Sequence, residues 1–455
     1  MLKRTILLIV ITLTTFINAL SFEDLAKDSY WVKANASISN IFPSSFEIYG
    51  SEQSQDQKVF RCTIFYASDG ITILAGNNED WSDPKTAFRF IPSSDGKHGW
   101  IKFGYAGGYP QGGMNDQGLF WDATGCAYLE MPFSETSKEK YSGSLMIKVM
   151  EECASVQEAR TIFENYYCED QYRAQYLIGD KSGTSIIVEG DSIIAKNGNY
   201  QVATNFYQSH PELGGYPCWR YDTAVSMLHN SSDLSTYLIG SILSATHQEG
   251  KYPTQYSNIY DLKQGIIYLF HFHNFEEFIK INLADELGKG NRVYDMPNLF
   301  SKIQTVSPKE DTTVNASRVT FKWNGKSTST YDLCYSMDPN FRDCNSVIVE
   351  ASHSYGLNRT LFGVVIIGLV VMGGAVNKKS KKYMVVVLTI FAVSLLLINC
   401  NDDITGHSNS GIDEFNVTID NLQKNSTYYW KVIAHPEGNN DFSSESIVQT
   451  FSTES

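Results

Sequence analysis

The chain has 455 residues, a formal net charge of −14, 42% apolar residues and 13% aromatic residues. The length predicts more than one domain, and the aromatic content favours strand-rich cores. The acidic charge argues against nucleic acid as a partner.

Residues 1–20 have the pattern of a secretory signal. Lys3 and Arg4 precede an apolar run from Ile6 to Ile17, and a small-residue zone follows. This order is typical of a signal peptide, so we expect the following chain to be exported. The alternative is an uncleaved membrane anchor, which also directs the rest of the chain out of the cytoplasm.

Residues 62–81 predict a β-hairpin. Two strand-like runs, Thr63–Ala67 and Ile71–Ala75, are separated by the turn sequence Ser68-Asp69-Gly70. The second run leads into a Gly-Asn-Asn-Glu-Asp sequence at residues 76–80. In a hairpin the first residue of one strand lies beside the last residue of its partner, so Cys62 and Asp80 should be neighbours.

The Cys-Thr pair at Cys62 and the run at residues 76–80 resemble the N-terminal-nucleophile (Ntn) hydrolases. The resemblance is to the choloylglycine hydrolase, penicillin V acylase and acyl-CoA:6-aminopenicillanic acid acyltransferase type. In that family a Cys-Thr pair opens the mature chain, and a G-[RQ]-N-x-D motif closes the hairpin. Gly76, Asn78 and Asp80 match the motif, whereas Asn77 stands where the bile-salt enzymes carry Arg.

The resemblance covers residues 62–300 and implies an α+β fold, a four-layer αββα sandwich. It also implies autocatalytic cleavage of the Arg61–Cys62 bond, which makes residues 21–61 a propeptide. Cys62 is then the nucleophile, its freed α-amino group is the base, and Asp80 orients that group. The alternative for Cys62 is a disulfide half or a buried apolar residue, and for Asp80 it is a turn cap. No metal or organic cofactor is implied.

Three further residues gain roles from the resemblance. Asp122 lies near the family's oxyanion-hole position, where a carboxylate repels an oxyanion unless it is protonated; backbone N–H groups are the alternative donors. Asn205, in Thr204-Asn205-Phe206, is expected to donate its amide to the oxyanion or to hold the α-amino group, with a turn residue as the alternative. Arg220 is expected to lower the thiol pKa of Cys62, with a surface salt bridge as the alternative.

Strand-like and helix-like runs alternate through this region. The strand-like runs are Phe88–Ile91, Trp100–Tyr105, Gln175–Ile178, Ser185–Glu189, Tyr200–Thr204 and Ile266–His273, and the helix-like runs are Gly143–Cys153, Val156–Tyr166, Tyr221–Leu228 and Leu234–Ser244. Ser155 is a suitable N-cap for the second of these helices. His271 and His273 alternate along the last strand and are expected to share one face. Because no third ligand is in register, a solvated or hydrogen-bonded pair is favoured over a metal site.

Residues 306–350 and 413–453 resemble two halves of one fibronectin type III-like β-sandwich, with Tyr428 near the start of a strand that resembles that fold's strand F. Between them, Leu361–Val376 and Tyr383–Ile398 are charge-free runs joined by a lysine-rich loop. They predict a transmembrane helical hairpin over residues 361–398 with its loop in the cytoplasm and both domains on the outer side. Buried core helices are the alternative.

The chain has eight cysteines, and none has the spacing of a zinc site. Because export permits disulfides, Cys334 and Cys344 are expected to pair across two strands, and Cys153 with Cys168 is a second candidate pair.

These features predict an exported, cell-surface or membrane-tethered amidohydrolase that cleaves linear non-peptide C–N bonds through an acyl-enzyme. N-acyl amino acids, N-acyl amines, penicillin-type amides and conjugated bile acids all remain open as the small-molecule amide substrate. The membrane is a partner through residues 361–398, and the oligomeric state is not indicated. The alternatives are an acyltransferase on the same scaffold and a non-catalytic surface protein for binding or adhesion.

Overall fold

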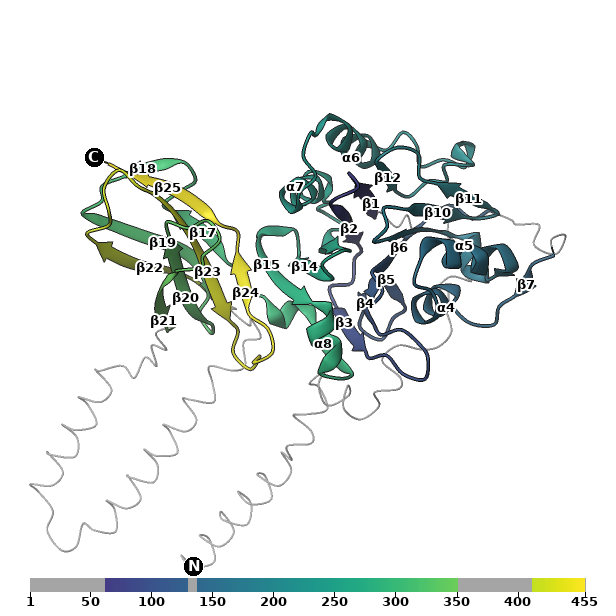
Figure 1. Cartoon of the computed structure of the whole chain (residues 1–455), viewed down its shortest axis with the longest axis horizontal. Coiled ribbons are helices and arrows are strands. Elements are labelled where there is room, and N and C mark those ends of the chain that lie inside the picture. Colours follow the sequence, from purple (N-terminus) through teal and green to yellow (C-terminus); the bar gives the residue numbers. More distant parts are fainter. Residues whose placement is uncertain (1–61, 130–136, 351–410, 455) are drawn as a thin grey trace, which may run out of the picture. The chain divides into compact units, whose positions relative to one another are not determined.

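The computed structural model describes residues 62–129, 137–350 and 411–454 (Figure 1). It divides into two compact units, with the boundary between Phe300 and Ser301. The signal peptide (1–20), the propeptide (21–61) and the membrane hairpin (361–398) lie outside the described residues and stay predictions. Among the helices of the described ranges, none combines the length and the apolar character that crossing a membrane requires.

One sheet of the first unit carries the predicted hairpin. Its strands run in the order β12-β1-β2-β13-β14-β15, and each pairs with its neighbours in the antiparallel direction. The bounds are Thr63–Ser68 (β1), Ile73–Asp80 (β2), Tyr200–Ala203 (β12), Thr254–Asp261 (β13), Ile266–His271 (β14) and Asn274–Asn282 (β15).

The second sheet of this unit runs in the order β11-β10-β9-β6-β5-β4-β3-β16 and is also antiparallel. The bounds are Thr86–Ile91 (β3), Trp100–Tyr105 (β4), Pro110–Asn115 (β5), Leu119–Gly125 (β6), Ala174–Asp180 (β9), Ser185–Glu189 (β10), Ser192–Ala195 (β11) and Arg292–Asp295 (β16). Two short strands, Glu139–Lys140 (β7) and Tyr166–Tyr167 (β8), pair in parallel.

Helices cover the outer face of each sheet (Figure 1). Trp219–Asn230 (α6) and Thr236–Thr246 (α7) pack on the first sheet, and Leu145–Glu152 (α4) and Val156–Asn165 (α5) pack on the second. The shorter helices are Leu283–Gly288 (α8), Glu169–Tyr172 (η3), Pro211–Leu213 (η4) and Met296–Leu299 (η5). As predicted, Ser155 caps α5, and Glu158 completes a capping box.

The inner faces of the two sheets pack against each other. Tyr66 on β1 crosses this layer, and its hydroxyl donates to the carbonyl of Asp180 at 2.6 Å. A Cβ at Gly179 would lie 2.3 Å from the Tyr66 ring, so the close approach of the sheets requires glycine there. The unit therefore has the helix–sheet–sheet–helix layering that the sequence predicted.

The second unit is a β-sandwich built from residues on both sides of the undescribed segment 351–410. One sheet has the order β17-β19-β22, and β18, β20, β21, β23, β24 and β25 lie in the other. The bounds are Gln304–Ser307 (β17), Thr312–Val314 (β18), Arg318–Lys326 (β19), Thr330–Ser336 (β20), Asn345–Val349 (β21), Ile412–Asp420 (β22), Thr427–His435 (β23), Ser444–Ser446 (β24) and Gln449–Thr453 (β25). Buried Trp323 and Trp430 lie in its core.

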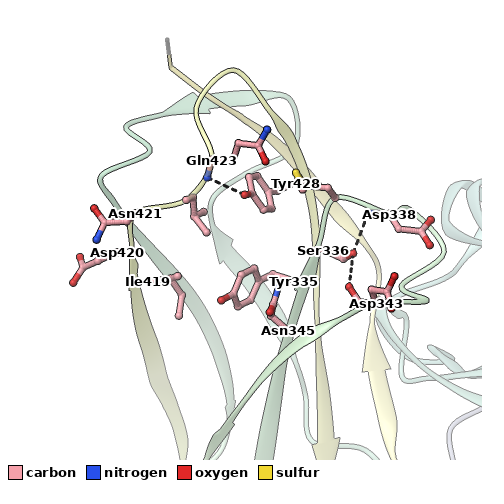
Figure 2. Close-up of a pocket in the computed structure, with 12 residues that line it drawn as sticks. Tyr335, Ser336, Asp338, Asp343, Asn345, Ile419, Asp420, Asn421, Gln423 and Tyr428 are labelled. Atoms are coloured by element: carbon pink, nitrogen blue, oxygen red, sulfur yellow. Dashed lines mark hydrogen bonds between the residues drawn. The ribbon is translucent and has the colours of Figure 1, made fainter.

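A tyrosine fixes one corner of this sandwich. The hydroxyl of Tyr428, the second residue of β23, accepts a hydrogen bond from the backbone N–H of Gln423 at 3.0 Å (Figure 2). This contact has the form of the tyrosine corner of immunoglobulin-like sandwiches. A groove of about 510 Å³ adjoins this corner. Figure 2 shows residues that line it, among them Ser336, whose hydroxyl accepts a hydrogen bond from the backbone N–H of Asp338. The assignment to the fibronectin type III class itself stays a prediction.

The described cysteines are paired in part as predicted. Cys334 and Cys344 form a disulfide with their Cα atoms 5.8 Å apart. Cys153 and Cys168 are both free, so that candidate pair is wrong.

Two boundaries in the first sheet differ from the prediction. Strand β2 starts at Ile73 and continues through the whole Gly-Asn-Asn-Glu-Asp run to Asp80, because this run pairs with β13 on its other edge. Strand β14 ends at His271, and Phe272 and His273 form the turn to β15, both with positive φ. The predicted shared face of His271 and His273 is therefore wrong, since only one of them belongs to the strand.

Candidate active site

Cys62 lies immediately before β1 and is 3% exposed. Thr63 pairs with Asn78, so the register places Cys62 opposite Glu79. Opposite residues of an antiparallel pair share a face, and successive residues alternate between faces. Cys62 and Glu79 therefore face the layer between the sheets, and Asp80 faces the helices.

Both acidic residues of the motif contact the cysteine. The backbone N–H of Asp80 donates to the Cys62 sulfur, and the Glu79 carboxyl lies close enough to the thiol to raise its pKa. The Tyr105 hydroxyl donates to Glu79 Oε1 at 3.2 Å, and Oε2 has no hydrogen-bond partner among the described residues. Asp80 is thus a neighbour of Cys62, but the carboxyl group that contacts the thiol belongs to Glu79.

The Asp80 side chain is fully buried on the helix side of β2. Its carboxylate accepts hydrogen bonds from Gln248 Nε2 at 2.6 Å and from Thr254 Oγ1 at 2.5 Å. Burial raises the Asp80 pKa to about 7, and the Arg220 guanidinium, 3.7 Å away, opposes this rise. Asp80 is the last residue of β2, and its bonds to Gln248 and Thr254, 168 and 174 positions away, are those of a buried residue that links distant segments rather than those of a local turn cap.

Arg220 is a buried cation near the start of α6, and it is 4% exposed. It donates to the backbone carbonyl of Cys62 at 2.5 Å, to Thr63 Oγ1 at 3.0 Å and to Asn205 Oδ1 at 3.0 Å. A surface salt bridge is therefore the wrong description. Arg220 instead binds the backbone of Cys62, the nucleophile candidate, and the side chains of Thr63 and Asn205.

The thiol of Cys62 is held in its neutral form. Burial raises its pKa well above the usual value, and the carboxylates of Glu79 and Asp80 raise it further. The predicted lowering of this pKa by Arg220 is not found, because the guanidinium binds the Cys62 carbonyl oxygen and lies against Asp80. Among the described residues, the groups that dominate this thiol pKa include no histidine.

Asn205 follows β12 and joins that strand to β6. Its side-chain N–H₂ donates to Thr124 Oγ1 at 2.6 Å and to the Gly125 carbonyl at 2.8 Å, and its Oδ1 accepts from Arg220. Both amide hydrogens are therefore used in this structure. Asn205 positions Arg220, and its donation to an oxyanion stays a prediction that requires these bonds to rearrange.

Asp122 lies on β6, is 1% exposed and points into the layer between the sheets. Neither carboxyl oxygen has a hydrogen-bond partner among the described residues. Burial raises its pKa well above the usual range, and the nearby Glu79 carboxylate raises it further. A protonated Asp122 is a hydrogen-bond donor, which is the condition under which it is compatible with an oxyanion.

Further polar atoms between the sheets lack partners within the described residues. They are the side-chain amide of Asn77, one oxygen of Glu79, the hydroxyl of Tyr256 and the Oδ1 of Asn258. The register places Asn77 opposite Asn258 and Glu79 opposite Tyr256, so these groups share the face that carries Cys62. Buried polar groups are nearly always hydrogen-bonded, so this patch can bind the polar atoms of a small molecule.

Sequence reasoning missed Glu79, Gln248 and Thr254. The alternation of side chains along a strand was the signal for Glu79, because it places that residue on the face of Cys62. Gln248 and Thr254 carry no local signal, since they reach Asp80 from a segment 168 and 174 positions along the chain. Arg61, the other half of the predicted cleavage site, lies outside the described residues.

Comparisons with known proteins give distant likenesses. No family model and no curated protein sequence match the chain. Among solved structures, it is similar to a conjugated bile acid hydrolase from Clostridium perfringens, with a TM-score of 0.40 and 19% identity over 51% of this chain and 96% of that one. It is also similar to penicillin V acylase from Agrobacterium tumefaciens, with a TM-score of 0.35 and 14% identity over 46% of this chain and 82% of that one.

Proposed function

We propose that the first unit is an autoprocessed cysteine amidohydrolase that cleaves linear, non-peptide C–N bonds. One observation supports it above the others: the buried Arg220 and the backbone N–H of Asp80 converge on Cys62, and Arg220 binds the backbone of that residue. This arrangement serves a cysteine whose own main-chain nitrogen takes part in the reaction. The Cys-Thr pair at Cys62 and the Gly-Asn-Asn-Glu-Asp sequence at residues 76–80 support the same interpretation.

In the uncleaved chain the thiol is protonated, since burial and two carboxylates raise its pKa, and it enters the processing step in this neutral form. Cleavage of the Arg61–Cys62 bond adds an α-amino group with a pKa of roughly 7.7–8. Its ammonium form offsets the charge of Glu79 and Asp80 beside the sulfur. Its neutral form accepts the thiol proton, which gives the thiolate that acts as the nucleophile.

The thiolate then attacks the amide carbonyl carbon, and the carbonyl oxygen becomes an oxyanion. Protonated Asp122 and the Asn77 amide are the donors that lie on the same face of the layer. The α-ammonium returns its proton to the departing nitrogen as the C–N bond breaks, which leaves a thioester on Cys62. Water attacks that thioester, releases the carboxylic acid and restores the thiol.

The charge of this layer bears on the substrate class. Glu79 and Asp122 are acidic, and Asn77 stands where the bile-salt enzymes carry Arg. We therefore favour amides without a carboxylate next to the scissile bond, such as N-acyl amines, over N-acyl amino acids. An acyltransferase differs only in the nucleophile that resolves the thioester, so product analysis in the presence of an added amine separates the two activities.

The test uses the full-length chain purified from the compartment to which it is exported. Mass and N-terminal sequence should show a mature chain that begins at Cys62, and Cys62→Ala should retain Arg61. Cys153→Ala is the matched control, because Cys153 is also a free, buried cysteine but lies at the end of α4. Release of primary amine is then measured with a fatty acyl ethanolamide, a fatty acyl glycine, penicillin V and a glycine-conjugated bile acid.

A wild-type chain that retains the residues before Cys62, or a Cys62→Ala variant that releases amine at the wild-type rate, would refute the proposal. The first result, together with saturable binding of an amide without turnover, would favour the non-catalytic surface protein. The location is a separate proposal: the signal peptide and residues 361–398 suggest an exported, membrane-tethered protein. Protease added to intact cells should degrade both units, and the protein should stay with the membrane fraction after a high-salt wash.

A further inference from the structure

A cluster of three side chains that can bind a metal ion lies near the end of α7. His247 is the C-cap residue of α7, Glu249 follows two residues later, and His273 lies in the turn between β14 and β15. Their ligand atoms all lie within 4.8 Å of one another. We infer that this cluster binds a divalent transition metal ion such as Zn²⁺ and thereby anchors the segment that supports Asp80.

The orientation of His247 suits a metal ligand. Its Nδ1–H donates to the backbone carbonyl of Ser244 at 2.5 Å, which leaves Nε2 as the nitrogen with a free lone pair. A metal-bound imidazole usually donates its other ring N–H to a carbonyl or carboxylate oxygen in this way. The Nε2 atom lies 3.5 Å from Glu249 Oε1, so the carboxylate stands on the ligand side of the ring.

The two imidazoles are spaced as a shared ion requires. Zn–N bonds of about 2.0–2.1 Å at tetrahedral angles place two ring centres about 5 Å apart. The ring centroids of His247 and His273 are 5.4 Å apart, and the rings are stacked with 11° between their planes. An ion lies in the plane of each imidazole that binds it, so one ring turns about its Cβ–Cγ bond when the ion binds. Two imidazoles and one carboxylate are a ligand set that zinc accepts, with a fourth position for water.

The turn that holds His273 is unusual for its residue types. His271 pairs with Asn274, so Phe272 and His273 form a two-residue turn, with φ of 48° and 46°. Such turns favour Asn-Gly, because both central residues adopt the left-handed conformation. Strain of this kind is often found at functional sites. Here it places the His273 imidazole beside His247.

The cluster is coupled to Asp80 through the intervening chain. Gln248, which lies between two of the ligands in sequence, donates from its side chain to Asp80 at 2.6 Å. The backbone N–H of Thr254 donates to the Gln248 carbonyl at 2.9 Å, and the Thr254 hydroxyl donates to Asp80. An ion on His247 and Glu249 therefore restrains residues 247–254, which supply both of these hydrogen bonds to Asp80. Metal binding does not depend on the proposed amidase activity; only an effect on that activity rests on it.

The test measures Zn²⁺ binding by the full chain, purified without a polyhistidine tag and stripped with chelator. Isothermal titration calorimetry and metal analysis should give one specific Zn²⁺ ion per chain. His273→Asn should weaken binding about 100-fold, because it removes one ligand while Asn keeps the left-handed turn. Glu249→Gln should also weaken it. His210→Ala is the matched control, since His210 also lies beside two carboxylates, those of Asp191 and Glu212.

A second measurement tests the coupling without an amide substrate. Zn²⁺ should slow amide hydrogen exchange in residues 247–254 of the wild-type chain and have no such effect in His273→Asn. Circular dichroism of each variant checks that it is folded. Absence of saturable binding, or equal affinity of the wild type and His273→Asn, would overturn the metal site. Binding that is lost in His210→Ala instead would assign the ion to the other cluster, and unchanged exchange in residues 247–254 would overturn the link to Asp80.

Discussion

The contact between Glu79 and Cys62 makes a prediction that depends on pH. Replacement of Glu79 by Gln keeps an acceptor for the Tyr105 hydroxyl and removes the carboxylate beside the sulfur. Two unit charges about 4 Å apart interact by about 4 kcal/mol at an effective dielectric constant of 20. This is more than the 1.4 kcal/mol that corresponds to a tenfold change in population. The ionised carboxylate therefore nearly prevents formation of the thiolate.

The titration of Glu79 sets the size of the effect. Burial raises its pKa to about 8, and the neighbouring Asp80 contributes to this rise. At pH 9 roughly one wild-type molecule in ten has a neutral Glu79, and only these form the thiolate as readily as the variant does. We expect Glu79→Gln to raise the alkylation rate of Cys62 about tenfold at pH 9. At pH 6 the carboxyl is protonated in the wild type, so the two rates should be nearly equal.

The assay follows iodoacetamide labelling of the peptide that contains Cys62 by mass spectrometry, at several pH values and at the same state of cleavage before Cys62. The result is expressed as the ratio of the Glu79→Gln rate to the wild-type rate, because burial of Cys62 slows labelling equally in both proteins. Glu189→Gln is the matched control: Glu189 raises the pKa of Cys126, so this variant should speed labelling of Cys126 and leave Cys62 unchanged. Equal rates at pH 9, or the same ratio at pH 6 as at pH 9, would refute the reasoning.

Three further predictions concern stability. In the uncleaved Cys62→Ala chain, the raised pKa values of Glu79 (about 8) and Asp80 (about 7) mean that the folded state binds more protons than the unfolded state between about pH 4 and 8. Their contribution to the free energy of unfolding is therefore full below pH 4 and is lost as the pH rises to 8. Urea unfolding should show that this free energy falls less steeply with pH when Glu79→Gln is added. Gly112→Ala should cost about 1–3 kcal/mol in urea unfolding, because its Cβ would lie 2.0 Å from a carboxyl oxygen of Asp122; Gly288→Ala, with no atom within 4 Å, should not destabilise. Tyr428→Phe should cost about 1 kcal/mol through the lost corner hydrogen bond, and an unchanged thermal midpoint of the second unit would contradict this.

Short-range patterns in the sequence were enough for the elements and for part of the site. The N-cap Ser155, the strand from Trp100 to Tyr105 and the hairpin that begins at Cys62 all follow from residue types a few positions apart. Hairpin geometry also places Asp80 next to Cys62. These features are local, so propensity, capping and alternation determine them.

The remaining features of the site depend on sheet order, register and burial. The pairing of β1 with β2 decides that Glu79 contacts the thiol, and the position of α6 brings Arg220 to the carbonyl of Cys62 across 158 residues. Burial then raises the pKa of the thiol, against the lowering that a nearby arginine suggests. His247 and His273 approach each other only because α7 packs on the sheet whose turn carries His273. Contacts between residues so distant in sequence depend on the packing of whole elements, which no local pattern encodes.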